Sequence, residues 1–233
     1  MAKDSKTKSL KDANRPKLWA TIAMNVVVLY AFTQYEAVSA AGLKGLVAGA
    51  TSLVPLTLAL ILTTIANGFL SDKIKVWLVF LRRRHALPGH RAFSQFAGSD
   101  PRIDVDGLRK LLGKDWPTEP EGENRTWYRL FKEIENDPAV LYAHGEYLFT
   151  RDYAGFAALF VVGLGTAAAF TVRPIPVLLV YLGCLILQFM VVRHVAVTYG
   201  NRFVCTVLAR KSARPIKEPA ARAKRASRPT KAT

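Results

Sequence analysis

Apolar and polar positions alternate in long blocks along this chain, and the apolar blocks lie on both sides of a polar block from Arg82 to Asp152. Each apolar block comes close to or exceeds the roughly 18 to 20 residues that a helix needs to cross a bilayer core. The pattern therefore predicts an all-α integral membrane protein with four transmembrane helices as two hairpins, and a small helical cytoplasmic domain between spans 2 and 3. The expected spans cover about residues 18–35, 46–70, 153–172 and 175–195.

Short connections within each pair of apolar blocks favour the hairpin arrangement. Residues 36–45 separate the first two blocks, and Arg173-Pro174 separates the last two. A cleaved signal peptide that ends near Ala40 is the rival interpretation of the first block. The long basic leader and the second apolar block that follows at once favour a span instead.

Three further segments complete the expected organisation around the hairpins at 18–70 and 153–195. The segments are a basic N-terminal tail at 1–17, an amphipathic linker with the cytoplasmic helical domain at 71–152, and an amphipathic segment with a basic disordered tail at 196–233. The first tail is Lys-rich, so we expect it to be disordered as far as Pro16.

Helical periodicity continues through the polar block. A first amphipathic stretch has apolar residues spaced i, i+3, i+4, i+7, which predicts a helix that lies at the membrane surface or continues span 2. Two helices follow, one from an Asp104 N-cap to Gly113 and one from about Glu121 to Glu135. The inward positions are expected to be Ile74, Trp77, Leu78 and Leu81 in the first stretch, Leu108, Leu111 and Leu112 in the second, and Trp127, Leu130, Phe131 and Ile134 in the third.

Asp137 and Pro138 predict the start of another helix, because Asp is a good N-cap and Pro is tolerated at the first helical position. No decisive helix breaker follows before the third apolar block. We therefore expect a single helix from Pro138 to about Val172, with its first half in the cytosol and its second half in lipid.

Basic residues are concentrated at the two ends of the chain, which carries a net charge of +16. Residues 1–17 have a net charge of +4 and residues 196–233 of +9, whereas residues 82–152 are neutral. Positive charge stays on the cytoplasmic side of membrane proteins, so we expect an inner-membrane protein with both termini and the middle domain in the cytoplasm. A nucleic-acid partner is not expected, because such partners require a basic folded surface.

The strongest candidate site is a face of the helix that begins at Pro138. His144, Tyr147 and Arg151 share this face, and Arg125 or Arg129 of the preceding helix would complete a site for an anionic ligand or a lipid head group. The alternative is an ion pair at the membrane interface, with the neighbouring tyrosines as anchors.

A second group of candidates concerns lipid contact and topology. Arg82, Arg83 and Arg84 form a cluster after the second apolar block, and Arg193 ends the fourth. His85 and His90 are weak metal candidates, and an interfacial role is the favoured interpretation of both. No cofactor is expected, and Cys184 and Cys205 imply neither a disulfide nor a metal framework.

No catalytic motif is present in the sequence, so no catalytic residue is assigned. The leading hypothesis is a non-enzymatic membrane module that binds membrane lipids and a cytoplasmic protein or small-molecule ligand, and whose spans form a homo-oligomer and respond. A membrane-perturbing or channel-like effector of a bacterial stress or defence system is one form of it. The alternatives are a membrane enzyme that acts on a lipid head group and a small transporter subunit.

Overall fold

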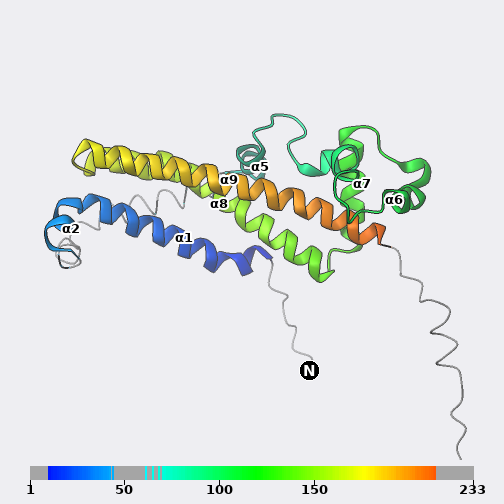
Figure 1. The fold of residues 1–233 in the computed structure, drawn as a ribbon, viewed down its shortest axis with the longest axis horizontal. Helices are drawn as coiled ribbons and strands as arrows, with labels where there is room; N and C mark the ends of the chain where they lie inside the picture. Colours follow the sequence, from blue (N-terminus) through cyan, green and yellow to red (C-terminus); the bar gives the residue numbers. More distant parts are fainter. Residues whose placement is uncertain are drawn as a thin grey trace, which may run out of the picture.

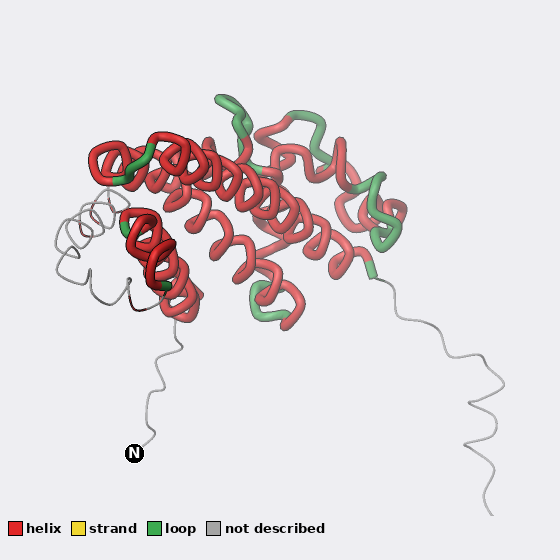
Figure 2. The backbone as a smooth tube through the Cα atoms, turned by 60° about the vertical axis from the view of Figure 1, so that its left-hand side comes forward, coloured by secondary structure: helices red, strands yellow, loops and turns green. Residues whose placement is uncertain are grey.

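The computed structural model describes residues 10–42 and 70–213, together with the isolated positions 44, 61, 65 and 68. These residues form helices and contain no strand (Figure 2). The predicted second span, residues 46–70, lies almost wholly outside the described residues. The α-helices are α1 (Leu10–Thr33), α2 (Tyr35–Ala41), α5 (Asp72–Phe80), α6 (Val105–Leu112), α7 (Pro120–Glu133), α8 (Pro138–Thr171) and α9 (Ile175–Ser212), and the short helices are η2 (Pro88–Arg91), η3 (Ala92–Phe96) and η4 (Gly113–Asp115).

Three helices, α1, α8 and α9, are long and apolar enough to cross a membrane, which indicates a membrane protein. They lie side by side, with α6 and α7 at one end of the α8–α9 pair and α5 nearer its middle (Figure 1). The prediction of one continuous helix from Pro138 is confirmed, because α8 has 34 residues without a break. At 1.5 Å per residue α8 is about 51 Å long, which exceeds a bilayer core of about 30 Å.

The N-terminal end of α1 corrects the expectation of disorder up to Pro16. The helix begins at Leu10 and contains Pro16, which cannot donate the usual backbone hydrogen bond. Asn14 supplies the missing stability, because its side chain is buried and donates to the carbonyl oxygen of Gly145 in α8 at 2.8 Å. Tertiary contact with α8 thus holds a turn that the local sequence does not favour.

Helix α5 forms as predicted but buries a different face. Its buried apolar residues are Val76, Val79 and Phe80, which pack against α8 and α9. The predicted inward residues Ile74 and Trp77 are instead 42% and 43% exposed. Leu81, predicted inward as well, is also exposed. Because α5 is apolar on two faces, periodicity alone could not distinguish the face that contacts protein from the one that does not.

The core of the small domain is completed by the end of α9. Phe203, Val204, Val207 and Leu208 are all buried there among α6, α7 and η3. The segment expected as an amphipathic stretch after residue 195 is therefore the uninterrupted continuation of α9. Leu108 and Phe131 are buried in this core as predicted, whereas Leu111 is 53% exposed because the short helix α6 contacts the core along one narrow face.

A buried carboxylate joins two parts of this domain. Glu123 of α7 is 2% exposed and accepts hydrogen bonds from the backbone N–H groups of Phe93 at 2.7 Å and Ser94 at 3.0 Å. These donors lie in the first turn of η3, where backbone N–H groups have no intrahelical partner. Glu123 therefore fixes η3 against α7.

On each of the three long helices, the charged residue that borders the uncharged part lies at a similar level along the helix bundle. Lys17, Asp152 and Arg193 border the uncharged parts of α1, α8 and α9. Lys17 Nζ lies 3.5 Å from Glu146 of α8, and Gln188 of α9 donates to the Tyr153 hydroxyl oxygen of α8 at 2.7 Å. The apolar parts of the helices therefore begin side by side, as a common boundary with a membrane surface requires.

Candidate functional site

Two cavities lie on either side of the loop that follows α5, and Leu87 lines both. We call the first, of about 570 Å³, the aromatic pocket. We call the second, of about 530 Å³, the cationic pocket. The aromatic pocket is lined by Leu10, Leu87, Asn124, Trp127, Tyr128, Phe131, Lys132, Glu135, Asn136, Leu141, His144, Tyr147 and Phe203. The cationic pocket is lined by Asp72, Lys73, Val76, Trp77, Arg82, Arg83, His85, Ala86, Leu87, His90 and Arg151.

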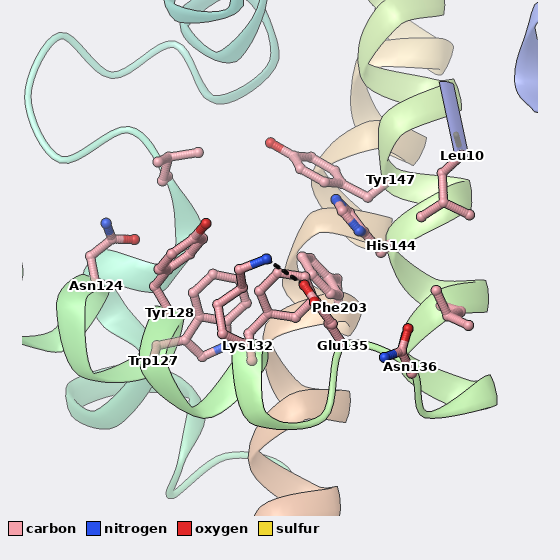
Figure 3. Close-up of a pocket in the computed structure, with 13 residues that line it drawn as sticks. Leu10, Asn124, Trp127, Tyr128, Lys132, Glu135, Asn136, His144, Tyr147 and Phe203 are labelled. Carbon is pink, nitrogen blue, oxygen red and sulfur yellow. Dashed lines mark hydrogen bonds and ion pairs between the residues drawn. The ribbon is translucent and has the colours of Figure 1, made fainter. Parts of the chain in front are cut away.

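Rings from three helices form the wall of the aromatic pocket (Figure 3). His144 of α8 stacks on Phe203 of α9, with ring centroids 4.7 Å apart and planes 5° from parallel. Phe131 of α7 meets both rings edge-on, at 5.4 Å from His144 and 5.3 Å from Phe203. The rings of α7, α8 and α9 are thus in mutual contact. A displacement of any of these rings would therefore act on both α8 and α9.

Two polar groups of the aromatic pocket lack partners. The Tyr147 hydroxyl and the Trp127 indole N–H are buried and form no hydrogen bond within the described part of the chain. The side chains themselves are only 6% and 8% exposed. Figure 3 shows Tyr147 extending from α8 with its hydroxyl directed away from that helix. Buried donors without partners are costly, but both atoms are shielded from solvent, so a ligand would bond to them only after the side chains that cover them move.

The cationic pocket contains four basic side chains and a single carboxylate. Lys73, Arg82 and Arg83 have no carboxylate within ion-pair distance in the described parts of the chain. Arg82 also repels the nearby Arg91, whose pKa is lowered by its burial and by that positive charge. The pocket therefore carries unbalanced positive charge and suits an anion.

Arg151 is the basic residue of this pocket that the fold holds most firmly. It is 7% exposed, and its guanidinium lies 3.2 Å from Asp72 and 3.0 Å from Asp152. Lys75 joins the group at 3.6 Å from Asp152. This network connects α5 to α8 at the level where the uncharged part of α8 begins.

The structure separates the residues that the sequence placed in one site. His144 and Tyr147 line the aromatic pocket, whereas Arg151 lines the cationic pocket. Arg125 and Arg129 are exposed on α7 and line neither cavity. Two turns of α8 divide His144 from Arg151, which is enough for Leu87 and its loop to lie between the two cavities.

The other candidates also fall into distinct places. Arg82 and Arg83 line the cationic pocket, Arg84 is exposed outside it, and Arg193 is half-buried with an unpaired Nε among the described residues. His85 and His90 lie together, with ring centroids 5.2 Å apart, and His85 Nδ1 is 3.3 Å from Glu121. The described residues contain no group of three or more side chains arranged to hold a metal ion.

Several pocket residues had no distinctive signal in the sequence. Phe203 and Trp127 are apolar positions of amphipathic helices, and the same pattern would place them in any helical core. Lys73 of α5 has the sequence context of a surface residue, and Trp77 is predicted to face the protein interior. Comparison with protein-family models, curated proteins and solved structures gives no match for this chain.

Proposed function

We propose that the chain is a non-enzymatic multi-pass membrane protein whose membrane-adjacent helical domain binds a small ligand in the aromatic pocket. Binding of the ligand would change the arrangement of the membrane spans. One observation carries the proposal. Helices α8 and α9 are uninterrupted over 34 and 38 residues, and each contributes both a pocket wall and an apolar segment. A helix transmits displacement along its axis, so reorganisation of the stacked His144 and Phe203 rings would reach the spans directly.

The path of the chain supports four spans as two hairpins. Helix α1 begins beside the domain, where Asn14 contacts Gly145, and ends where the rings of Phe32 and Tyr181 meet at 5.1 Å. The next long described segment, which includes α5, begins at Leu70, back beside the domain (Figure 1). Residues 46–70 are apolar and long enough in sequence to be the proposed span 2. The distribution of basic residues supports an orientation in which the domain and both termini lie on the cytoplasmic side of a bacterial inner membrane.

The pocket chemistry favours a planar ligand with hydrogen-bond acceptors. Aromatic rings recognise flat apolar faces, and the unpaired donors of Tyr147 and Trp127 would bond to acceptor atoms on the ligand's edge once the side chains that shield them move. A cavity of about 570 Å³ has the size of a typical small-molecule site.

The binding half of the proposal is tested with the purified full chain in lipid nanodiscs. A set of heteroaromatic probes that includes adenine, indole and quinoline is screened for an increase in melting temperature. Tyr147→Phe should weaken binding of a hit by about tenfold, because it removes one hydrogen-bond donor and keeps the ring. Tyr142→Phe is the matched control, since Tyr142 lies on the same helix and is 59% exposed. Equal loss in both variants, or no hit in the parent, contradicts the proposal.

The coupling half uses Cys184 as a reporter. This free cysteine is exposed on the apolar part of α9, whereas Cys205 is buried. We expect a probe that binds the pocket to change the rate of Cys184 oxidative cross-linking between copies, which also reports the proposed homo-oligomer. Gly-Gly inserted after Thr150 rotates the register of α8 by about 200° and should reduce this response. The same insertion after Gly113, in a surface turn, is the control.

The effector form of the proposal has its own readout. Expression of the parent in bacterial cells should lower the membrane potential when the probe is present, and the Thr150 insertion should restore it. An unchanged potential with intact cross-linking would exclude this form and leave the ligand-responsive membrane protein.

A further inference from the structure

A segment of unusual backbone geometry presents the arginines of the cationic pocket. Leu81 and His85 have φ angles of 51° and 50°, in the left-handed region that residues with a Cβ seldom adopt. They bracket Arg82, Arg83 and Arg84 and turn the chain back over α5. Strained backbone of this kind persists where the rest of the structure enforces it, and it is concentrated at binding sites.

The charge balance of the pocket favours an anion. With the histidines counted as neutral, Lys73, Arg82, Arg83 and Arg151 face one carboxylate, that of Asp72. Asp72 is already shared, because Arg151 lies 3.2 Å and Lys11 lies 3.7 Å from it. The positive charges of Lys73, Arg82 and Arg83 thus converge on one cavity without compensation from the described residues, an arrangement that a bound multivalent anion would stabilise.

Apart from His85 and His90, the remaining wall of the cavity is apolar, and it lies beside the last charged residues before the uncharged part of α8. Trp77, Val76, Ala86 and Leu87 line it beside the basic groups. Arg151 and Asp152 are the last charged residues of α8 before the uncharged stretch 153–172. An occupant can therefore place a charged group against the arginines while an apolar part lies along the exposed Trp77 ring, as interfacial tryptophans permit.

We propose that the cationic pocket binds a phosphate group, with Arg82 and Arg83 as its main ligands, Lys73 as a further cation and Arg151 as a fixed charge at the base. Guanidinium groups match phosphate oxygens in pairs, and the clustered charge favours phosphate over a monovalent anion. Two sources share this chemistry, namely the head group of an anionic phospholipid and a water-soluble phosphate ester. This site is separate from the aromatic pocket, so it stands or falls independently of the function proposed above.

The experiment titrates the purified full chain in a zwitterionic detergent with four probes, and isothermal titration calorimetry measures binding. The probes are short-chain dihexanoyl phosphatidylglycerol, dihexanoyl phosphatidylcholine, glycerol 3-phosphate and inorganic phosphate. We expect saturable binding of at least one anionic probe. Binding of phosphatidylglycerol alone identifies a lipid source, and binding of glycerol 3-phosphate or inorganic phosphate identifies a soluble one. Saturation by none of the anionic probes overturns the proposal.

Charge-neutral variants assign the site to the pocket. The double variant Arg82→Gln/Arg83→Gln should bind the best probe about tenfold more weakly or worse, as expected for lost charge-assisted hydrogen bonds. Arg84→Gln removes the same charge from the same exposed loop but outside the lining, and should stay within about twofold of the parent. An equal loss in Arg84→Gln would show general surface attraction and overturn the site.

A second variant tests whether the loss of binding comes from lost charge and not from an altered conformation of the loop that holds Arg82 and Arg83. Lys73→Gln alters an exposed residue of α5, which the loop geometry does not control, and it should also weaken binding at an unchanged melting temperature. Parent-like affinity in both Lys73→Gln and the double arginine variant would likewise refute the assignment.

Discussion

Asn14 and Gly145 are joined by a hydrogen bond of 2.8 Å that connects the first turns of α1 to the part of α8 beside the domain. The Asn14 side chain is 7% exposed, so the bond is shielded from water. It is the contact that explains why α1 is ordered across Pro16, where the local sequence argues against a helix.

Asn14→Ala should therefore detach the start of α1. We expect the unfolding free energy to fall by about 1–2 kcal/mol, because a buried carbonyl loses its second partner and a buried side chain is truncated. Trypsin should then cleave faster after Lys11 and Lys17, whereas Pro16 blocks cleavage after Arg15. Lys17→Ala is the stability control, since its ion pair with Glu146 is exposed and should contribute about 0.5 kcal/mol or less. Parent-like resistance of Asn14→Ala to trypsin would show that another contact holds α1.

Gly200 marks the closest approach of α9 to α5 and α8. A Cβ at this position would lie 2.9 Å from Phe80 Cζ and 3.0 Å from Tyr147 Cε2, closer than atoms can pack without displacement. Gly200→Ala should lower the melting temperature and destabilise the domain by about 1–3 kcal/mol. Gly183→Ala, on the same helix with open space around it, should be neutral or slightly stabilising. Equal melting temperatures for the two variants would contradict the packing at Gly200.

The contrast between α8 and α5 shows what the sequence could predict. Asp137 and Pro138 specify the start of α8 through local chemistry, and Asp137 indeed accepts from the N–H groups of Ala139 and Val140. The buried face of α5 depends on which neighbour it meets, because α5 has apolar residues on both its buried and its exposed faces. Local signals therefore located the helices, while burial required the tertiary arrangement.

The candidate site illustrates the same limit. Spacing placed His144, Tyr147 and Arg151 on one helical face, and they do follow one another along α8. Which cavity each one lines is decided by the loop around Leu87, whose path depends on positive φ angles at Leu81 and His85. Leu and His do not predict a positive φ angle from sequence, so no local sequence pattern could predict the division into two pockets.

Protonation of Asp100 should make the free energy of unfolding depend on pH. Hydrogen bonds from the Arg102 side chain lower the pKa of Asp100 to about 2, below its ordinary value near 4. The unfolded chain therefore takes up the proton at a higher pH than the folded chain, so the stabilisation is complete above about pH 4 and is lost between about pH 4 and pH 2. Asp100→Asn should remove this part of the acid dependence, worth at most about 2 kcal/mol because Arg102 is half exposed.

The measurement compares chemical unfolding of the parent and Asp100→Asn at pH 5, pH 4 and pH 3. Asp115→Asn is the control, since Asp115 is exposed and forms no ion pair within the described residues. The same pH dependence in the parent and in Asp100→Asn would mean that the Asp100–Arg102 pair does not stabilise the fold.

Membrane topology is tested by single cysteines in a chain with Cys184→Ser and Cys205→Ala. Ser39 is exposed on α2, at the far end of α1, and Asp115 is exposed in the domain. Four spans with a cytoplasmic domain predict that a membrane-impermeant maleimide labels Ser39→Cys in intact cells, and labels Asp115→Cys only after the membrane is permeabilised.

Two other patterns of labelling have definite physical meanings. Labelling of Asp115→Cys alone would preserve the spans and invert the orientation, against the distribution of basic residues. Labelling of both positions in intact cells would place α2 and the domain on one side of the membrane. Helix α1 would then not cross, although its residues 18–33 are uncharged and Ile22 and Leu29 pack against the apolar part of α8 and α9. Because α1, α8 and α9 share that core, the same result would also argue against crossing by the other two helices.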